Sequence, residues 1–281
     1  MEVRKRIIPS QDYNQLQLQK TFGKKGLENG EFKHPYSVTT NSFLQIIVTD
    51  TYNHRIQVFS QKGQFLFKFG SQGKEDGEFN SPNAIAVDAN DNIIVADSGN
   101  NRIQKFDPNG KFLLKIEGLK QPSAIGIDGH DQIFVSEYIS QIQVFSPNGE
   151  FRFKFGAKGS GVGELATPSG IAITSNGNII VSEFGNHRIQ IFDQNGKYLK
   201  MFGTKGKLNG QLLHPYQMVL DSQENLLVAD SNNNRIQVFD SNGFYLAQFG
   251  QGKLNYPTSI AINQMGTIYV PSVNGFNVSI F

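Results

Sequence analysis

The sequence predicts an all-β fold in which a four-stranded antiparallel unit occurs six times. A phrase of the form Asn-x-Arg-Ile-Gln-x-Phe marks four of the units, and shorter forms without the Arg mark two more. The phrases stand at 53–59, 100–106, 140–145, 186–192, 233–239 and 276–281. A Pro opens each unit, at residues 35, 82, 122, 168, 215 and 257, so the units repeat every 40 to 47 residues. That interval is typical of a β-propeller blade, and six copies predict a six-bladed ring.

The order of strands within a unit follows from its pattern of residues. A small apolar segment after each Pro, such as 84–87, predicts the first strand. A polar turn at 88–92 separates it from the continuous apolar run 93–96, which predicts a second strand buried on both faces. The recurring phrase supplies the third strand, because its β-branched residues suit a sheet.

An Asn-Gly turn then predicts a hairpin, since both residues tolerate positive φ. The dipeptide follows the third strand at 109–110, 148–149, 195–196 and 242–243. The fourth strand alternates between aromatic and cationic residues, as in 151–155, which is typical of an outer strand with one wet face. A Gly-rich connection returns the chain to the next Pro.

The last copy ends at Phe281, after its third strand, and an N-terminal segment is the candidate for the missing fourth strand. Residues 18–23 align with the fourth strand and following Gly of the first unit, 65–70. A strand supplied in this way would close the ring and remove the exposed sheet edges. We therefore predict an N-terminal arm at 1–15 and one six-bladed propeller at 16–281, with 16–23 closing the last blade.

Composition excludes several classes of protein. The 281 residues carry a net charge of only +2, which rules out a grossly basic nucleic-acid binder. No Cys is present, so neither a disulfide nor a thiolate metal site can form. The N-terminus lacks the apolar core of a signal peptide, and no apolar run is long enough for a membrane span. We expect a soluble, cytoplasmic and monomeric protein without a cofactor.

Two phrases show a resemblance to a known family. Val-Ala-Asp-Ser-x-Asn-Asn-Arg-Ile-Gln-x-Phe occurs at 95–106 and 228–239, and Phe-Gly-x-x-Gly…Phe-x-x-Pro spans 69–82. These phrases resemble NHL repeats, above all those in the C-terminal propellers of tripartite-motif NHL proteins. The resemblance implies a six-bladed propeller that binds single-stranded or hairpin RNA on its top face in some members and protein partners in others. Gln141, Asn277 and Ser272 depart from the repeat pattern, so contacts made through those positions do not carry over.

Each complete repeat places an acid five residues before its Arg. The pairs are Asp50 with Arg55, Asp97 with Arg102, Glu183 with Arg188 and Asp230 with Arg235. We interpret them as ion pairs that bridge the loop between the second and third strands, in preference to a ring of carboxylates around a channel. The third repeat keeps Glu137 but has no Arg, which favours a different role for that acid.

An enzyme is the least favoured function. The positions after each Pro hold no His, Asp or Glu, so acid–base or metal chemistry on the axis has little support. The His residues recur at equivalent repeat positions, namely His34 with His214 and His54 with His187. A resemblance to amidating-lyase propellers keeps a metal-dependent lyase or hydrolase as a remote alternative.

The distribution of charge is more informative than the net charge. The connections that follow the fourth strands carry nine Lys against six acids, and adding the loop acids and Arg residues leaves this face at +2. The turns of the opposite face carry ten acids against three Lys, which gives −7. Such a molecule orients an anionic partner onto its basic face. Acids that merely cap turns are the alternative explanation of the acidic face.

The basic face also carries aromatic residues, which base stacking requires. We predict a non-catalytic propeller that binds RNA there, with Asn83 and Gln217 bonding to bases and Lys residues binding phosphates. The candidate RNA-binding residues are Tyr36, Tyr52, His54, Asn83, Tyr138, Phe184, His187, Lys205, Lys207, His214, Tyr216, Lys253 and Tyr256. Few acids stand in units five, six and one, so the ligand is expected off-centre over those units. The alternative is a protein-interaction scaffold, such as the substrate-recruiting domain of a ubiquitin ligase-type protein.

Overall fold

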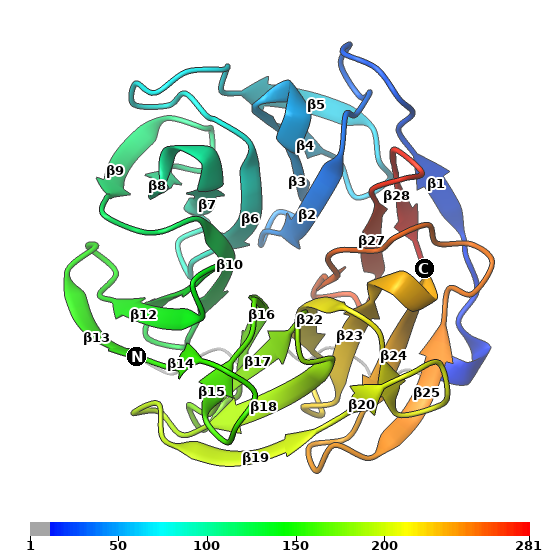
Figure 1. Cartoon of the computed structure of the whole chain (residues 1–281). Helices are drawn as coiled ribbons and strands as arrows, with labels where there is room; N and C mark the ends of the chain where they lie inside the picture. The colour runs from blue at the N-terminus through cyan, green and yellow to red at the C-terminus, as the bar shows by residue number, and fades with distance from the viewer. Residues whose placement is uncertain (1–11) are drawn as a thin grey trace.

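Six four-stranded antiparallel blades surround a central axis in the computed structural model, which describes residues 12–281 (Figure 1). The chain runs round the ring once, and each of blades one to five is a single uninterrupted stretch of sequence. The predicted six-bladed propeller is confirmed.

The strands of the first three blades follow one another in sequence order. Blade one consists of β2 (Pro35–Thr40), β3 (Ile46–Asp50), β4 (Arg55–Phe59) and β5 (Phe65–Phe69). Blade two consists of β6 (Pro82–Val87), β7 (Ile93–Asp97), β8 (Arg102–Phe106) and β9 (Phe112–Ile116). Blade three consists of β10 (Pro122–Ile127), β11 (Ile133–Glu137), β12 (Gln141–Phe145) and β13 (Phe151–Phe155).

The other three blades follow the same plan, except that blade six takes its outer strand from the N-terminal part of the chain. Blade four consists of β16 (Pro168–Ile173), β17 (Ile179–Glu183), β18 (Arg188–Phe192) and β19 (Tyr198–Phe202). Blade five consists of β22 (Pro215–Leu220), β23 (Leu226–Asp230), β24 (Arg235–Phe239) and β25 (Tyr245–Phe249). Blade six consists of β26 (Ala261–Ile262), β27 (Ile268–Ser272), β28 (Asn277–Ile280) and β1 (Lys20–Phe22).

Several loops contain short elements of secondary structure. Two long connections contain parallel pairs, β14 (Ala157–Lys158) with β15 (Glu164–Leu165) and β20 (Thr204–Lys205) with β21 (Gln211–Leu212). Three loops between second and third strands contain 3-10 turns, η2 (Thr51–Asn53), η3 (Ser98–Asn100) and η4 (Ser231–Asn233). A further turn, η1 (Tyr13–Gln15), precedes the first strand.

Strand β1 closes the ring, as the alignment with the first unit predicts. It pairs antiparallel with β28, with Lys20 opposite Ile280 and Phe22 opposite Val278. Phe22 is buried and packs 4.9 Å from Phe59 of blade one, measured between ring centroids. The strand is shorter than the predicted closing segment of 16–23, because its ordered pairing covers three residues.

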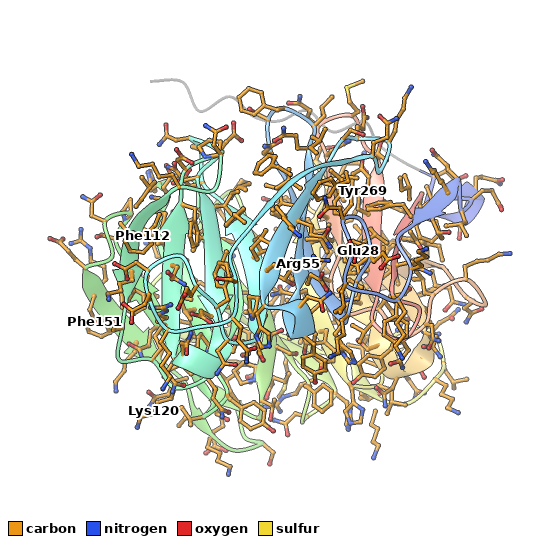
Figure 2. All side chains as sticks on the ribbon, turned by 90° about the horizontal axis from the view of Figure 1, so that it is seen from above. Glu28, Arg55, Phe112, Lys120, Phe151 and Tyr269 are labelled. Carbon is orange, nitrogen blue, oxygen red and sulfur yellow. The ribbon has the colours of Figure 1, made fainter. Side chains whose placement is uncertain are left out.

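The hydrophobic core lies between neighbouring blades. The second and third strands are buried on both faces, which explains their continuous apolar sequences. Fourth strands alternate between partly buried and exposed residues, as in β5. Their exposed side chains, among them Phe151, form the rim of the molecule (Figure 2). No helix among residues 12–281 is long and apolar enough to cross a membrane.

Residues 12–15 dock against blade five, a contact that the sequence does not predict. Tyr13 is buried, stacks 6.3 Å from Phe249 and donates a hydrogen bond of 2.8 Å to Asp221 Oδ2. Most of the predicted arm, residues 1–11, lies outside the described residues.

Candidate functional site

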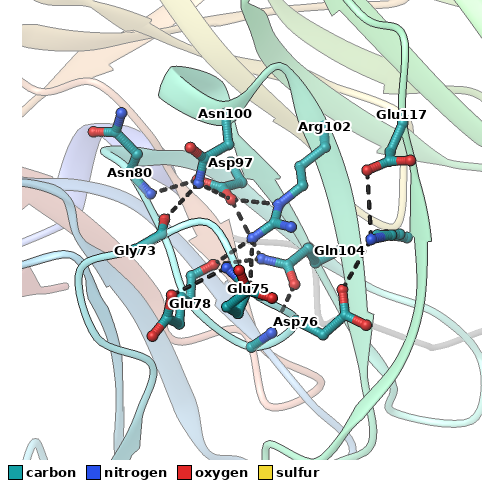
Figure 3. A network of polar contacts seen from close by, with 12 residues as sticks. Gly73, Glu75, Asp76, Glu78, Asn80, Asp97, Asn100, Arg102, Gln104 and Glu117 are labelled. Atoms are coloured by element: carbon teal, nitrogen blue, oxygen red, sulfur yellow. Dashed lines mark hydrogen bonds and ion pairs between the residues drawn. The ribbon is translucent and has the colours of Figure 1, made fainter.

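We call the face that carries the connections from fourth to first strands, together with the loops from second to third strands, the upper face. In blade two the loop and the connection are joined by one guanidinium (Figure 3). Arg102 Nε donates to Asp97 Oδ2 at 2.8 Å, and Nη2 donates to the carbonyl oxygens of Glu75 and Glu78, both at 2.8 Å. Asn100 and Gln104 add amide hydrogen bonds to the same carboxylate. The Arg therefore fixes the connection onto its blade.

The same network recurs in blades one, four and five. The distance from Arg Nε to the carboxylate is 2.7 Å for Arg55, 2.6 Å for Arg188 and 2.7 Å for Arg235. The carboxylates are fully buried. The predicted pairing of acid and Arg is confirmed, and these charges neutralise one another inside the fold.

A second repeated contact latches the loops of blades one, two, four and five to the next blade. His54 Nδ1 accepts the backbone N–H of Ser81 at 3.0 Å, and His187 Nδ1 accepts that of His214 at 3.0 Å. In the equivalent places Asn101 Oδ1 accepts from Gln121, and Asn234 Oδ1 accepts from Tyr256. All four latch residues have positive φ, a conformation for which Asn and His are enriched. His54 and His187 thus each commit one ring nitrogen to the ring structure, a role that the sequence analysis missed.

The latch imidazoles are held neutral. Burial lowers the pKa of His54, and the charge of Lys33 lowers it further. Burial likewise lowers the pKa of His187, with smaller contributions from His214 and Lys205. A neutral Nδ1 is also what the hydrogen bond requires, since a protonated nitrogen cannot accept.

An aromatic cluster lies where blades four, five, six and one meet on the upper face. Tyr216 is its centre, with ring centroids 5.2 Å from Phe184, 5.6 Å from Tyr36 and 6.0 Å from Tyr256. His214 stacks on Phe184 at 4.1 Å, with an interplanar angle of 14°. These five rings, all named by the sequence analysis, are brought together from separate blades. Each is partly buried, so the rings pack on one another as well as facing outward.

Two polar atoms at this cluster have no hydrogen-bond partner among the described residues, Asn83 Oδ1 and His214 Nδ1. Burial strongly raises the pKa of Tyr36 and of Tyr216, so both hydroxyls stay protonated and can donate. Gln217, expected to contact bases, is instead buried below this layer and lines the axial cavity.

The remaining predicted aromatic residues lie apart from the cluster. Tyr52 is 49% exposed on blade one, where its ring lies 4.3 Å from His34. Lys25 Nζ lies 5.2 Å from the ring of Phe276 nearby. Tyr138 is 57% exposed on blade three and contacts no other aromatic ring within the described part of the chain.

The Lys residues of the upper face differ in how they are partnered. Lys205, Lys207 and Lys253 are exposed, and none of them makes an ion pair within residues 12–281. Lys24, by contrast, pairs with Glu31 at 3.1 Å. Uncompensated positive charge therefore gathers over blades five and six, beside the aromatic cluster.

The acids of the opposite face cap its turns. Asp107 Oδ1 accepts the backbone N–H groups of Asn109 and Lys111 at 2.9 and 2.8 Å. Asp131 accepts the N–H of Ala89 in the neighbouring blade at 2.8 Å. Turn capping thus explains the acidic composition of this face, although the negative charge remains.

The axis contains a cavity of about 310 Å³, lined by the first strands of all six blades. Its wall is mainly aliphatic and holds no titratable side chain; its polar members are Ser37, Thr39, Thr40, Gln217 and Ser259. Within residues 12–281 no three His, Asp or Glu side chains come together in a way that suits a metal ion.

Comparison with known proteins shows which family two of these repeats match. The NHL repeat family matches residues 165–192 and 213–239, which lie in and before blades four and five. Blades four and five therefore contain NHL repeats. A second family, described as a 6-bladed beta-propeller, matches residues 28–118.

Two curated relatives each match a short stretch of this chain. Protein brain tumor of Drosophila melanogaster is 47% identical over 47 residues, which is 17% of this chain and 4% of that protein. The B-box type zinc finger protein ncl-1 of Caenorhabditis elegans has the same identity over the same length, 6% of that protein. The match therefore spans a small part of either relative.

Solved structures similar to this propeller include enzymes. A streptogramin B lyase has a TM-score of 0.69 at 13% identity, covering 95% of this chain and 99% of its own. A gluconolactonase from Xanthomonas campestris has a TM-score of 0.70 at 15% identity, covering 90% and 86%. At these identities the similarity shows the fold alone.

Proposed function

We propose that the chain is a non-catalytic RNA-binding propeller that takes single-stranded or hairpin RNA on its upper face. The observation that carries this proposal is the aromatic cluster around Tyr216, lying beside exposed Lys residues that have no acidic partner within residues 12–281. The resemblance to NHL repeats of tripartite-motif proteins supports it.

The two components have separate chemical roles. Lys205, Lys207 and Lys253 supply the phosphate contacts, which position RNA without reading its sequence. The partly buried rings offer edges and faces to unstacked bases. Asn83, half-buried beside Tyr36, is the amide proposed to bond to a base.

Charge favours the same placement of the ligand. The connection 203–210 holds two Lys and no acid, whereas the equivalent connection of blade two holds Glu75, Asp76 and Glu78 beside Lys74. The RNA therefore lies off-centre, over blades five, six and one.

The test is a salt titration of binding to a set of unstructured RNA oligomers. For single strands the slope of log K against log salt is about −0.7 per neutralised phosphate, so Lys205→Glu with Lys207→Glu should flatten it by about 1.4. Tyr216→Ala should instead weaken binding by about 1–3 kcal/mol and leave the slope unchanged, as loss of stacking does. Thermal melting of each variant checks that the ring remains folded.

Lys74→Glu is the matched control, because it reverses an exposed Lys that already lies among acids. An equal loss of affinity for this variant would contradict the off-centre placement. Affinity that is independent of salt would contradict RNA binding itself.

A protein-interaction scaffold is the second candidate, favoured by aliphatic side chains at the tips of the long connections. Leu27, Val162 and Leu208 are 66%, 62% and 71% exposed. Leu208→Ser should abolish binding of a protein partner and leave RNA affinity intact if this face serves as such a scaffold.

A further inference from the structure

Blade three differs from the complete blades at the upper face. Five residues, 117–121, connect it to blade two, whereas twelve residues, 70–81, connect blade two to blade one. Its loop between second and third strands is one residue shorter than that of blade two, and Gln141 takes the place of the Arg. Both the guanidinium and the segment that it would hold are therefore missing.

The acid of this blade is retained and deeply buried. Glu137 is 1% exposed, and its Oε1 accepts the backbone N–H of Lys120 at 2.6 Å. No Lys or Arg among residues 12–281 lies within ion-pair distance of it.

Blade four shows what Glu137 has lost, because it uses the same residue type. Glu183 Oε1 accepts from Arg188 Nε at 2.6 Å and from Gln190 Nε2 at 2.8 Å. Its Oε2 accepts from the N–H of Ala166 and from Asn186 Nδ2. Glu137 keeps only the counterpart of the Ala166 contact.

Blade six shows that this remaining contact does not require a carboxylate. There Ser272 Oγ accepts the equivalent N–H, that of Asn255, at 3.2 Å, and Asn277 replaces the Arg. Blade six has lost the acid and the Arg together, whereas blade three has lost the Arg alone. A buried carboxylate without a cation is costly, and the fold of this same chain dispenses with it elsewhere.

We propose that Glu137 is the binding site for an arginine side chain of a protein partner. The partner's loop takes the place of the missing connection and inserts its guanidinium where Arg188 lies in blade four. Tyr138 and Ile139, 57% and 42% exposed, flank the site and supply apolar contact. Lys120 lies beside the site, and Figure 2 shows its side chain at the margin of the molecule. Its charge disfavours a partner that places a further cation next to Lys120. The site lies on blade three, away from the aromatic cluster, and does not depend on RNA binding.

Arginine is favoured over lysine by the geometry of the complete blades. In each of them the carboxylate is met by a planar guanidinium whose other nitrogens reach carbonyl oxygens of the connection. A partner that supplies both the Arg and those carbonyl groups reproduces the whole arrangement.

The experiment is an NMR titration of the full chain with the peptide acetyl-Gly-Gly-Arg-Gly-Gly-amide. The amide of Lys120 is the reporter, since it donates to Glu137 directly. We expect a saturable shift of that amide, at least tenfold weaker for the citrulline peptide, which keeps the shape but not the charge. The shift should be lost in Glu137→Gln, which retains an acceptor for the Lys120 amide.

A stability comparison provides an independent measurement. Glu137→Gln removes an unpaired buried charge and should leave the melting temperature unchanged or raise it by a few degrees. Glu183→Gln, the matched variant in blade four, removes a paired charge and should lower it.

Three results would overturn the proposal. One is no shift of the Lys120 amide at millimolar peptide, and another is an undiminished shift in Glu137→Gln. The third concerns Lys154, which lies opposite Gln143 on the next strand. Binding that appears only after Lys154→Met would mean that this lysine already serves Glu137.

Discussion

Replacing Arg235 by Ala should destabilise the propeller more than replacing any exposed Arg. Arg235 is 2% exposed, and its Nε donates to Asp230 Oδ2 at 2.7 Å. Nη1 donates to Gln248 Oε1 at 2.7 Å, and Nη2 donates to the carbonyl oxygens of Leu208 and Gln211 at 2.9 and 3.0 Å. The substitution leaves a buried carboxylate without its cation and removes one donor from each of the two carbonyl groups, which keep the Gln211 N–H and the Gln237 amide as donors.

The magnitude follows from what remains around the carboxylate. Removing one partner of a buried ion pair costs about 3–5 kcal/mol. Asp230 still accepts from the N–H of Leu213, from Asn233 and from Gln237, so its charge keeps three hydrogen bonds. We therefore expect the lower end, about 3 kcal/mol, which corresponds to a fall of about 6–12 °C in melting temperature.

Thermal melting followed by circular dichroism measures this loss, with Arg152→Ala as the control. Arg152 is exposed and lies 4.0 Å from Glu150, also exposed, so its removal should change the free energy of unfolding by under about 0.5 kcal/mol. Equal melting temperatures for the two variants would refute the assignment of Arg235 as the anchor of its connection.

Three further outcomes are expected. The wild type should lose stability as the pH falls below about 6.5, because the pKa of His187 is lowered in the folded state and unfolding therefore takes up a proton in that range. Thermal melts between pH 8 and pH 5 should show a smaller loss for His187→Asn. An unchanged loss would argue against the latch. Deleting residues 1–23 removes β1 and the burial of Phe22, worth about 1.5–3 kcal/mol by itself, so size-exclusion chromatography should show aggregation; a stable monomer would contradict closure by β1. Tyr13→Phe removes a buried hydrogen bond to Asp221 and should cost about 1.5–3 kcal/mol in chemical unfolding, whereas the exposed Tyr138→Phe should cost nothing measurable.

The strands, the ring closure and the ion pairs were all predictable because each leaves a local pattern that the repeat copies. The run Ile93 to Ala96 is buried on both faces as its composition indicates, and the acid-to-Arg spacing recurs four times. The position of β1 followed from its likeness to β5, which the repeat made visible.

Contacts between blades were harder to predict, because they join residues with no fixed relation in sequence. Tyr36 and Tyr216 are 180 positions apart in number and meet only when the ring closes. The latch left a signal that was overlooked: His54, Asn101, His187 and Asn234 share one repeat position, tolerate positive φ and offer an acceptor. Gln217 was predicted to lie on the upper face, but it lies one residue beyond Tyr216 and its side chain lines the axial cavity.

The pairing of Lys20 with Ile280 also sets the order of events during synthesis. The ribosome releases the segment that forms β1 before the other strands of the propeller, and its partner β28 is the last of these strands to be made. Contacts between residues so far apart in sequence form late, because a long loop must close before they can be made. Before β28 is made, blades one to five can assemble in turn, while the backbone groups of the β1 segment remain unpaired. The nascent chain therefore passes through an open arc whose two ends are exposed sheet edges, and it is in this state that pairing with another chain competes with completion of the ring.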